Sequence, residues 1–85
     1  MRPLQTEAIE NHHPLAQRLY TALLHVQGAQ GANSRGAWLR DVMDAAREED
    51  VWDCEYRMAQ LVSTGLVTID GDLYRPETLF SVVRA

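Results

Sequence analysis

The order of structural elements can be read most directly from one stretch of the chain, Ala59-Gln60-Leu61-Val62-Ser63-Thr64-Gly65-Leu66-Val67-Thr68-Ile69-Asp70-Gly71-Asp72-Leu73-Tyr74-Arg75-Pro76. The stretch predicts a helix that runs into Gly65, because glycine readily adopts the left-handed conformation that caps many helices. A hairpin then follows, with strands at residues 66–69 and 72–75. Asp70-Gly71 is typical of a tight type I′ turn, whose two central residues need positive φ. Pro76 would end the second strand, since proline has no N–H to donate.

The helix before Gly65 is expected to begin at Val51. A helical wheel places two sets of residues on its faces. The inward set is Val51, Cys54, Met58, Leu61 and Val62, and the outward set is Trp52, Asp53, Tyr56, Arg57, Gln60, Ser63 and Thr64. Glu55 falls beside the inward face, where an arginine such as Arg40 or Arg18 could pair with it. The acidic run Glu48-Glu49-Asp50 precedes the helix and suits the positive end of its dipole.

An earlier helix is predicted from Pro14 to Gln27, with Pro14 at its first position and Gly28 at its end. Its apolar stripe is unusually wide and comprises Leu15, Ala16, Leu19, Tyr20, Ala22, Leu23, Leu24 and Val26. A lone surface helix needs a narrower apolar face. Two interpretations follow: the helix is central to the fold, or part of it meets another chain. In the second case the candidate dimer face is Leu15, Leu19, Tyr20 and Leu24.

Residues 28–36 are glycine-rich and are expected to form a loop, followed by a second helix over residues 37–47. The apolar face of that helix would be Trp38, Leu39, Val42, Met43, Ala45 and Ala46. Residues 1–13 are weakly patterned and predict either a frayed arm or a short helix through Leu4, Ala8 and Ile9. We therefore expect one domain over residues 14–85. For residues 77–84 a short helix is favoured, although Phe80 and the neighbouring valines also permit a strand.

Composition indicates a small acidic globular protein. The chain has 85 residues, 46% of them hydrophobic and 24% charged, with a formal net charge of −4. All 8 basic residues are arginines, and they are scattered along the chain. The single cysteine, Cys54, excludes an internal disulfide and fits a reducing cytoplasm. We expect no membrane span and no secretory signal, because no apolar run approaches about 18–20 residues and the N-terminus lacks a basic-then-apolar block.

The segment from Trp38 to Pro76 resembles a winged helix-turn-helix domain. Structural positions carry the resemblance: Leu39, Val42 and Ala46 on the second helix, Val51, Met58 and Leu61 on the third, then Gly65-Leu66-Val67 and the Asp70-Gly71 hairpin. The resemblance implies an α+β fold with a three-helix core and a β-hairpin wing. In this family the loop before the second helix often carries a short strand that pairs with the wing.

In DNA-binding members of this superfamily the third helix enters the major groove and the wing contacts the flanking backbone. The residues that would face the groove by position are Trp52, Asp53, Tyr56, Arg57 and Gln60, and Thr64 could touch phosphate. The wing residues are Asp70, Gly71, Asp72 and Arg75. Arg57 and Gln60 have side chains that can read guanine and adenine. The acidic residues of the same helix and wing would oppose phosphate, on which most nonspecific affinity depends.

Two functions fit this pattern. The first is a non-enzymatic module that acts through protein–protein interaction, as a dimerisation module, adaptor or regulatory subunit. It is favoured by the acidic third helix and by Trp52 and Tyr56, since aromatic anchors are enriched at interface hot spots. The alternative is a dimeric DNA-binding regulator of transcription, which the resemblance favours and the charges oppose.

The sequence predicts no catalytic residue, cofactor, metal or small-molecule ligand. Cys54 lies on the inward face of its helix and is expected to be a small buried side chain instead of a nucleophile. His12, His13 and His25 lack the spacing of a metal motif. No P-loop, dinucleotide fingerprint or nucleophile elbow is present.

Overall fold

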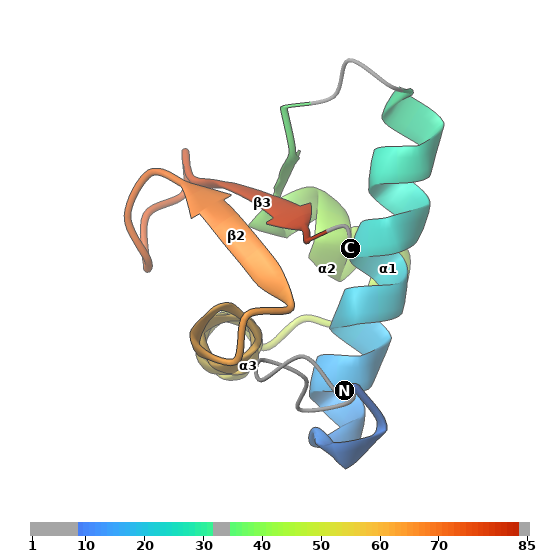
Figure 1. Ribbon diagram of the computed structural model, residues 1–85, viewed down its shortest axis with the longest axis vertical. Helices are drawn as coiled ribbons and strands as arrows, with labels where there is room; N and C mark the ends of the chain where they lie inside the picture. The colour runs from blue at the N-terminus through green and yellow to red at the C-terminus, as the bar shows by residue number, and fades with distance from the viewer. Residues whose placement is uncertain (1–8, 32–34, 84–85) are drawn as a thin grey trace, which may run out of the picture.

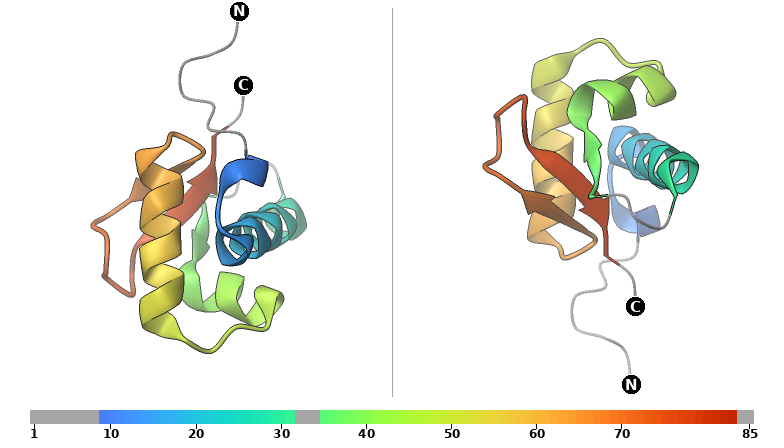
Figure 2. Two further views of the ribbon diagram at one scale, coloured as in Figure 1. Left: turned by 90° about the horizontal axis from the view of Figure 1, so that it is seen from below. Right: turned by 90° about the horizontal axis from the view of Figure 1, so that it is seen from above.

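A computed structural model describes residues 9–31 and 35–83 of the chain. In these residues the fold is mixed α+β, with three α-helices and a 3-stranded antiparallel sheet. The elements in chain order are the 3₁₀ helix η1 (Ile9–Asn11), α1 (Pro14–Gln30), β1 (Ala37–Trp38), α2 (Leu39–Ala46), α3 (Val51–Ser63), β2 (Val67–Asp70) and β3 (Leu79–Val82). Helix α1 runs along one side of the molecule, with α2, α3 and the sheet on the other (Figure 1). Two further views show α3 lying alongside the sheet (Figure 2).

The sheet has the strand order β1-β3-β2, so β3 is the central strand. Ala37 pairs with Phe80 on one side, and Val67 pairs with Val82 on the other. The helix favoured for residues 77–84 is therefore wrong, and the strand alternative is correct. Phe80 is buried in the core from this strand. Burial of Phe80 and pairing with strands on both sides outweighed the helical spacing there.

The predicted hairpin is also wrong in its turn and its second strand. Strand β2 ends at Asp70, but residues 71–78 form a longer connection before β3 begins at Leu79. Gly71 has a φ of 120°, whereas Asp70 is not among the residues with positive φ, so a type I′ turn does not form. The buried Thr78 hydroxyl donates to the carbonyl of Asp72 and closes the connection on itself. An aspartate-glycine pair thus begins the connection without making it tight.

Helix α1 is longer than predicted and lies at the centre of the packing. It ends at Gln30, with Gly31 as its C-cap, and passes through Gly28 without interruption. Pro14 occupies its first turn as expected, and the Nδ1 atom of His13 accepts a hydrogen bond from the Leu15 N–H at 3.0 Å. Helix α1 packs against α2, α3 and the sheet. Its wide apolar stripe is therefore used within the monomer.

Helices α2 and α3 keep the predicted order with altered ends. Helix α2 begins at Leu39, because Ala37 and Trp38 form β1, and the left-handed Arg47 ends it. At the start of α3, Asp50 Oδ1 accepts a hydrogen bond from the Asp53 N–H at 3.1 Å, which satisfies one free donor of the first turn. Gly65, after the end of α3, has a φ of 85°, which confirms the predicted left-handed residue.

The hydrophobic core draws on all three helices and the sheet. Its buried members are Leu15, Ala16, Leu19, Ala22, Leu23, Ala37, Leu39, Val42, Met43, Cys54, Met58, Leu61, Val67 and Phe80. Val51 was predicted to join them but is 52% exposed, because α3 begins at the rim of the core. Trp38, Ala45 and Ala46 likewise lie outside the buried set. Of the helices in residues 9–31 and 35–83, none has the length and apolar character needed to cross a bilayer.

Candidate functional site

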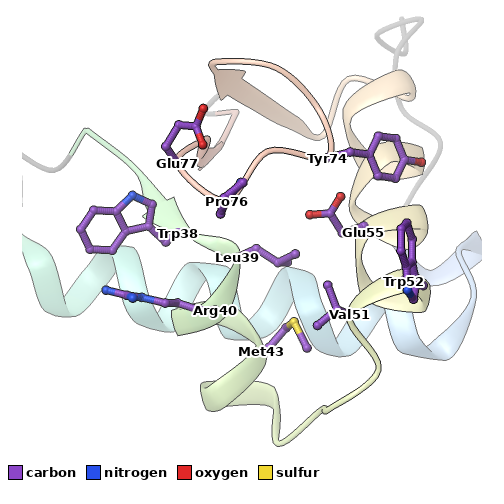
Figure 3. A pocket seen from close by; sticks show the side chains of 10 residues that line it. All are labelled: Trp38, Leu39, Arg40, Met43, Val51, Trp52, Glu55, Tyr74, Pro76 and Glu77. Carbon is purple, nitrogen blue, oxygen red and sulfur yellow. The ribbon is translucent and has the colours of Figure 1, made fainter.

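An open apolar cleft lies where the start of α2, the start of α3 and the β2–β3 connection meet. Its volume is about 560 Å³, and it is lined by Trp38, Leu39, Arg40, Met43, Val51, Trp52, Glu55, Tyr74, Pro76 and Glu77 (Figure 3). Three aromatic residues border it while remaining open to solvent: Trp38 is 42% exposed, Trp52 80% and Tyr74 52%. Aromatic side chains at this exposure keep much of their apolar surface in contact with water. That surface becomes buried only when another molecule covers it.

The backbone presents each aromatic ring for a separate reason. In the strand β1, Ala37 points into the core, so its neighbour Trp38 points outward. Trp52 lies in the first turn of α3, beyond the edge of the core. Tyr74 lies in the β2–β3 connection, and its φ of 66° is uncommon for a bulky residue. The cleft is therefore assembled from three separate segments of the chain.

The charges in the cleft are separated along its length. At one end, the guanidinium carbon of Arg40 lies 4.9 Å from the ring centre of Trp38, within cation–π distance. Toward the other end, the carboxylate of Glu55 points to the middle of the cleft, with Trp52 and Tyr74 beside that end (Figure 3). Burial raises the pKa of Glu55 above its ordinary value. Glu77 adds a second carboxylate to the lining.

The structure divides the residues predicted for the outer face of α3. Trp52 lines the cleft, whereas Arg57, Gln60 and Thr64 line a different, smaller hollow beside His12 and His13. Tyr56 is exposed, and the guanidinium carbon of Arg57 lies 5.1 Å from the centre of its ring. Asp53, Tyr56, Arg57 and Gln60 contact one another along the outer face of α3, and Trp52 alone of the six candidates lines the cleft.

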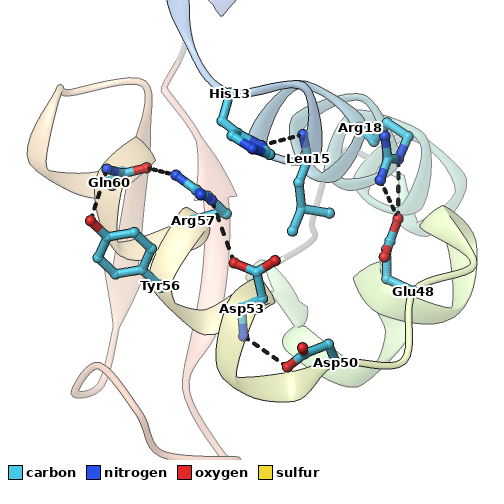
Figure 4. Close-up of polar contacts among 9 residues, drawn as sticks. All are labelled: His13, Leu15, Arg18, Glu48, Asp50, Asp53, Tyr56, Arg57 and Gln60. Atoms are coloured by element: carbon cyan, nitrogen blue, oxygen red, sulfur yellow. Dashed lines mark hydrogen bonds and ion pairs between the residues drawn. The ribbon is translucent and has the colours of Figure 1, made fainter.

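Arg57 and Gln60 are held by contacts within α3 (Figure 4). Arg57 Nη1 donates to Gln60 Oε1 at 3.1 Å, and Arg57 Nε lies 3.5 Å from Asp53 Oδ1 without hydrogen-bond geometry. Thr64 Oγ1 donates to the Gln60 carbonyl at 3.0 Å and lies 3.2 Å from His12 Nε2. Side chains in such a network must break existing contacts before they reach a base or a phosphate.

The predicted wing residues stay at the surface and outside the cleft. Asp70, Gly71, Asp72 and Arg75 are all exposed, and Asp70 lies 3.6 Å from Arg35 in an ion pair. Their neighbours Tyr74, Pro76 and Glu77 line the cleft instead. Sequence reasoning missed these neighbours because it assigned Tyr74 to a strand. Pro76, which was taken only as a strand end, was the available signal for a loop.

The predicted dimer face is wrong for two of its residues. Leu15 and Leu19 are buried inside the monomer, and Tyr20 packs partly against the same core. Leu24 alone of the four is exposed. The physical reason is that α2, α3 and the sheet together cover most of the stripe on α1 and leave Leu24 exposed. The packing confirms that α1 is central to the fold, and contact of its exposed part with another chain stays a prediction.

Cys54 is fully buried in the core, which confirms its assignment as a small buried side chain. The pKa of Cys54 is raised to about 11. Burial is the main cause, and the nearby carboxylates of Glu48, Asp53 and Asp50 add to it. A thiol with this pKa is almost entirely protonated at neutral pH and is a poor nucleophile.

Arg18, which the sequence offered as a partner for Glu55, bonds Glu48 at 2.5 Å instead.

Within residues 9–31 and 35–83, no three His, Cys, Asp or Glu side chains gather in a way that could hold a metal ion. Leu4 and Ala8, proposed for a short N-terminal helix, lie outside the residues that the structure describes. Comparisons of the chain with protein-family models, with curated proteins and with solved structures gave no match.

Proposed function

We propose that this protein is a non-enzymatic winged-helix module that docks a partner protein through the aromatic cleft. The element order α1-β1-α2-α3-β2-β3 supports the winged-helix assignment. So does the pairing of β1 with β3, because this superfamily often places a short strand before the second helix that pairs with the wing. Whether the module serves as an adaptor or as a regulatory subunit depends on the partner. Its single buried cysteine fits a reducing compartment such as the cytoplasm.

One observation carries the proposal: three solvent-exposed aromatic side chains surround a single apolar cleft. Interface hot spots are enriched in tryptophan and tyrosine and cluster in pockets that become desolvated on binding. Trp52, at 80% exposed, is the strongest candidate anchor. A second copy of the chain is one partner of this kind, which gives a homodimer built on the cleft instead of on α1.

DNA binding receives less support from the same geometry. The two base-reading candidates, Arg57 and Gln60, bond to each other. The cleft lining contributes one arginine and two glutamates. A DNA interface needs several cations facing phosphate, and a dimeric transcriptional regulator would also need two such faces one helical turn apart. Protein docking is therefore the better explanation of the exposed aromatic residues.

Site-specific photo-cross-linking in cells of the source organism tests the proposal. A benzophenone amino acid replaces Trp52 in one variant and Thr21, an exposed residue of α1, in the matched control. We expect a discrete cross-linked protein, or a cross-linked dimer, from position 52 and none from position 21. Equal products at both positions, or none at either, would contradict docking through the cleft.

A titration of the isotope-labelled protein with mixed-sequence duplex DNA separates the two functions. At about 50 mM salt, where nonspecific binding is strong, we expect the amide signals of α3 and of the β2–β3 connection to stay unchanged. Shifts that concentrate on residues 52–64 and 70–75 would transfer the proposal to DNA binding.

A further inference from the structure

The two ends of the aromatic cleft differ in how their charges are balanced. At the Trp38 end, the chain supplies its own cation, since Arg40 stacks on the indole ring. At the Trp52 end, Glu55 supplies a carboxylate. The ion pairs found within residues 9–31 and 35–83 join Arg18 to Glu48, Arg35 to Asp70, Arg40 to Asp41 and Arg57 to Asp53. None of these pairs includes Glu55, so among the described residues this carboxylate has no cation partner.

The surroundings of Glu55 make an unpaired carboxylate unfavourable. Leu39, Val51 and Trp52 line the cleft with it, and its exposure is intermediate. Burial in this apolar setting raises the pKa of Glu55, and the shift has no counteracting contribution from a neighbouring cation. Water solvates the charged carboxylate only in part here. A positive group entering the cleft would stabilise that charge.

We propose that the Trp52 end of the cleft binds the guanidinium group of an arginine presented by the partner protein within an apolar segment. This inference rests on the proposed docking function and names the chemistry of the partner. Glu55 accepts hydrogen bonds from the guanidinium, whose fork of donors matches a carboxylate. Trp52 and Tyr74 border this end of the cleft (Figure 3), and aromatic rings attract a planar cation. Arg40 on Trp38 is an example of that attraction within the chain itself.

Arginine fits this site better than lysine or a neutral side chain. Its guanidinium is planar and weakly hydrated, so it stacks on aromatic rings and leaves water more readily than an ammonium group does. Glu77, toward the Trp38 end (Figure 3), places a second carboxylate on the lining, so the cleft as a whole favours a positive segment over an acidic one. Leu39, Met43 and Val51 provide apolar surface for the residues that flank the arginine.

The chain's two tryptophans, Trp38 and Trp52, both line the cleft and report on it directly. The probe is a blocked pentapeptide with arginine between two leucines, and its matched control carries citrulline, the neutral isostere of arginine. Binding of each peptide is followed through the two indole N–H signals of isotope-labelled protein. We expect the arginine peptide to bind about tenfold more tightly than the citrulline peptide, the factor typical of one added charge-assisted contact. The larger shift should fall on Trp52.

Glu55→Gln should reduce this ratio of affinities to less than about twofold, while Glu49→Gln, at an exposed carboxylate outside the cleft, should preserve it. The amide spectrum of each variant verifies that it is folded, and Glu55→Ala repeats the test with a second side chain. Equal affinity for the two peptides, an unchanged ratio in Glu55→Gln, or no response of either indole would each overturn the arginine site. A cross-link from position 52 combined with equal affinities would leave protein docking intact and remove only this inference.

Discussion

Helix α3 has two apolar faces, one buried in the core and one exposed to solvent. Cys54, Met58 and Leu61 on one face are completely buried against the rest of the chain. Trp52 and Tyr56 on the other are half to largely exposed. A helix with one apolar stripe requires one partner surface, whereas this helix has enough apolar surface for two. The fold supplies the first partner, and the second is the basis of the docking proposal.

Among substitutions on α3, we expect the largest change in stability on the buried face. Leu61→Ala should lower the free energy of unfolding by about 2–5 kcal/mol, because it removes buried methyl groups and leaves a cavity. Urea denaturation followed by circular dichroism measures this loss. A loss below about 1 kcal/mol would mean that α3 packs less tightly than its burial indicates.

Substitution of Glu55, which lies between the two faces, should change stability less and in the opposite direction. Its folded-state pKa is raised by burial, so folding favours the protonated form. Above that pKa the wild type bears the cost of a partly buried charge, and Glu55→Gln should be slightly more stable. As the pH falls through the folded-state pKa, the wild type takes up a proton and the advantage disappears. Melting temperatures of both proteins at neutral pH and at about pH 3 test this, and an advantage that grows on acidification would refute it.

The smallest effect on stability should follow Trp52→Ala, on the outer face. The ring is 80% exposed, so its removal should change the unfolding free energy by no more than about 0.5 kcal/mol. The same variant should lose the response to the arginine peptide. Chemical denaturation beside the wild type provides the measurement. A marked loss of stability would show that Trp52 supports the core, and the contrast between the two faces would fail.

Much of the helical fold could be predicted from local signals. Pro14 at the start of α1, Asp50 before α3 and Gly65 after it each act through their own backbone, so sequence reveals them. The second strand could not be placed in this way. Asp70-Gly71 has the composition of a tight turn, but β3 forms at Leu79 because Phe80 reaches the core and pairs with Ala37 from a distant segment.

The candidate site was predictable only in part, for the same reason. The exposure of Trp52 and Tyr56 follows from helical spacing. Trp38 was assigned to the buried face of a helix, because a strand of two residues is too short to give a periodic signal. The cleft depends on three segments meeting, and Tyr74 enters it from a connection whose length the sequence did not disclose. Long-range packing, and not side-chain chemistry, was the missing information.

The central position of β3 has a consequence for how the chain folds as it is synthesised. This strand pairs with both β1 and β2, yet it follows them in the chain. Val82 also donates its N–H to Gln27 Oε1 of α1 at 2.7 Å, which ties the strand to an early helix. On the ribosome, β1 and β2 therefore emerge before any strand that can pair with them. The helices can begin to pack during translation, whereas the sheet forms only after residues 79–82 have left the exit tunnel.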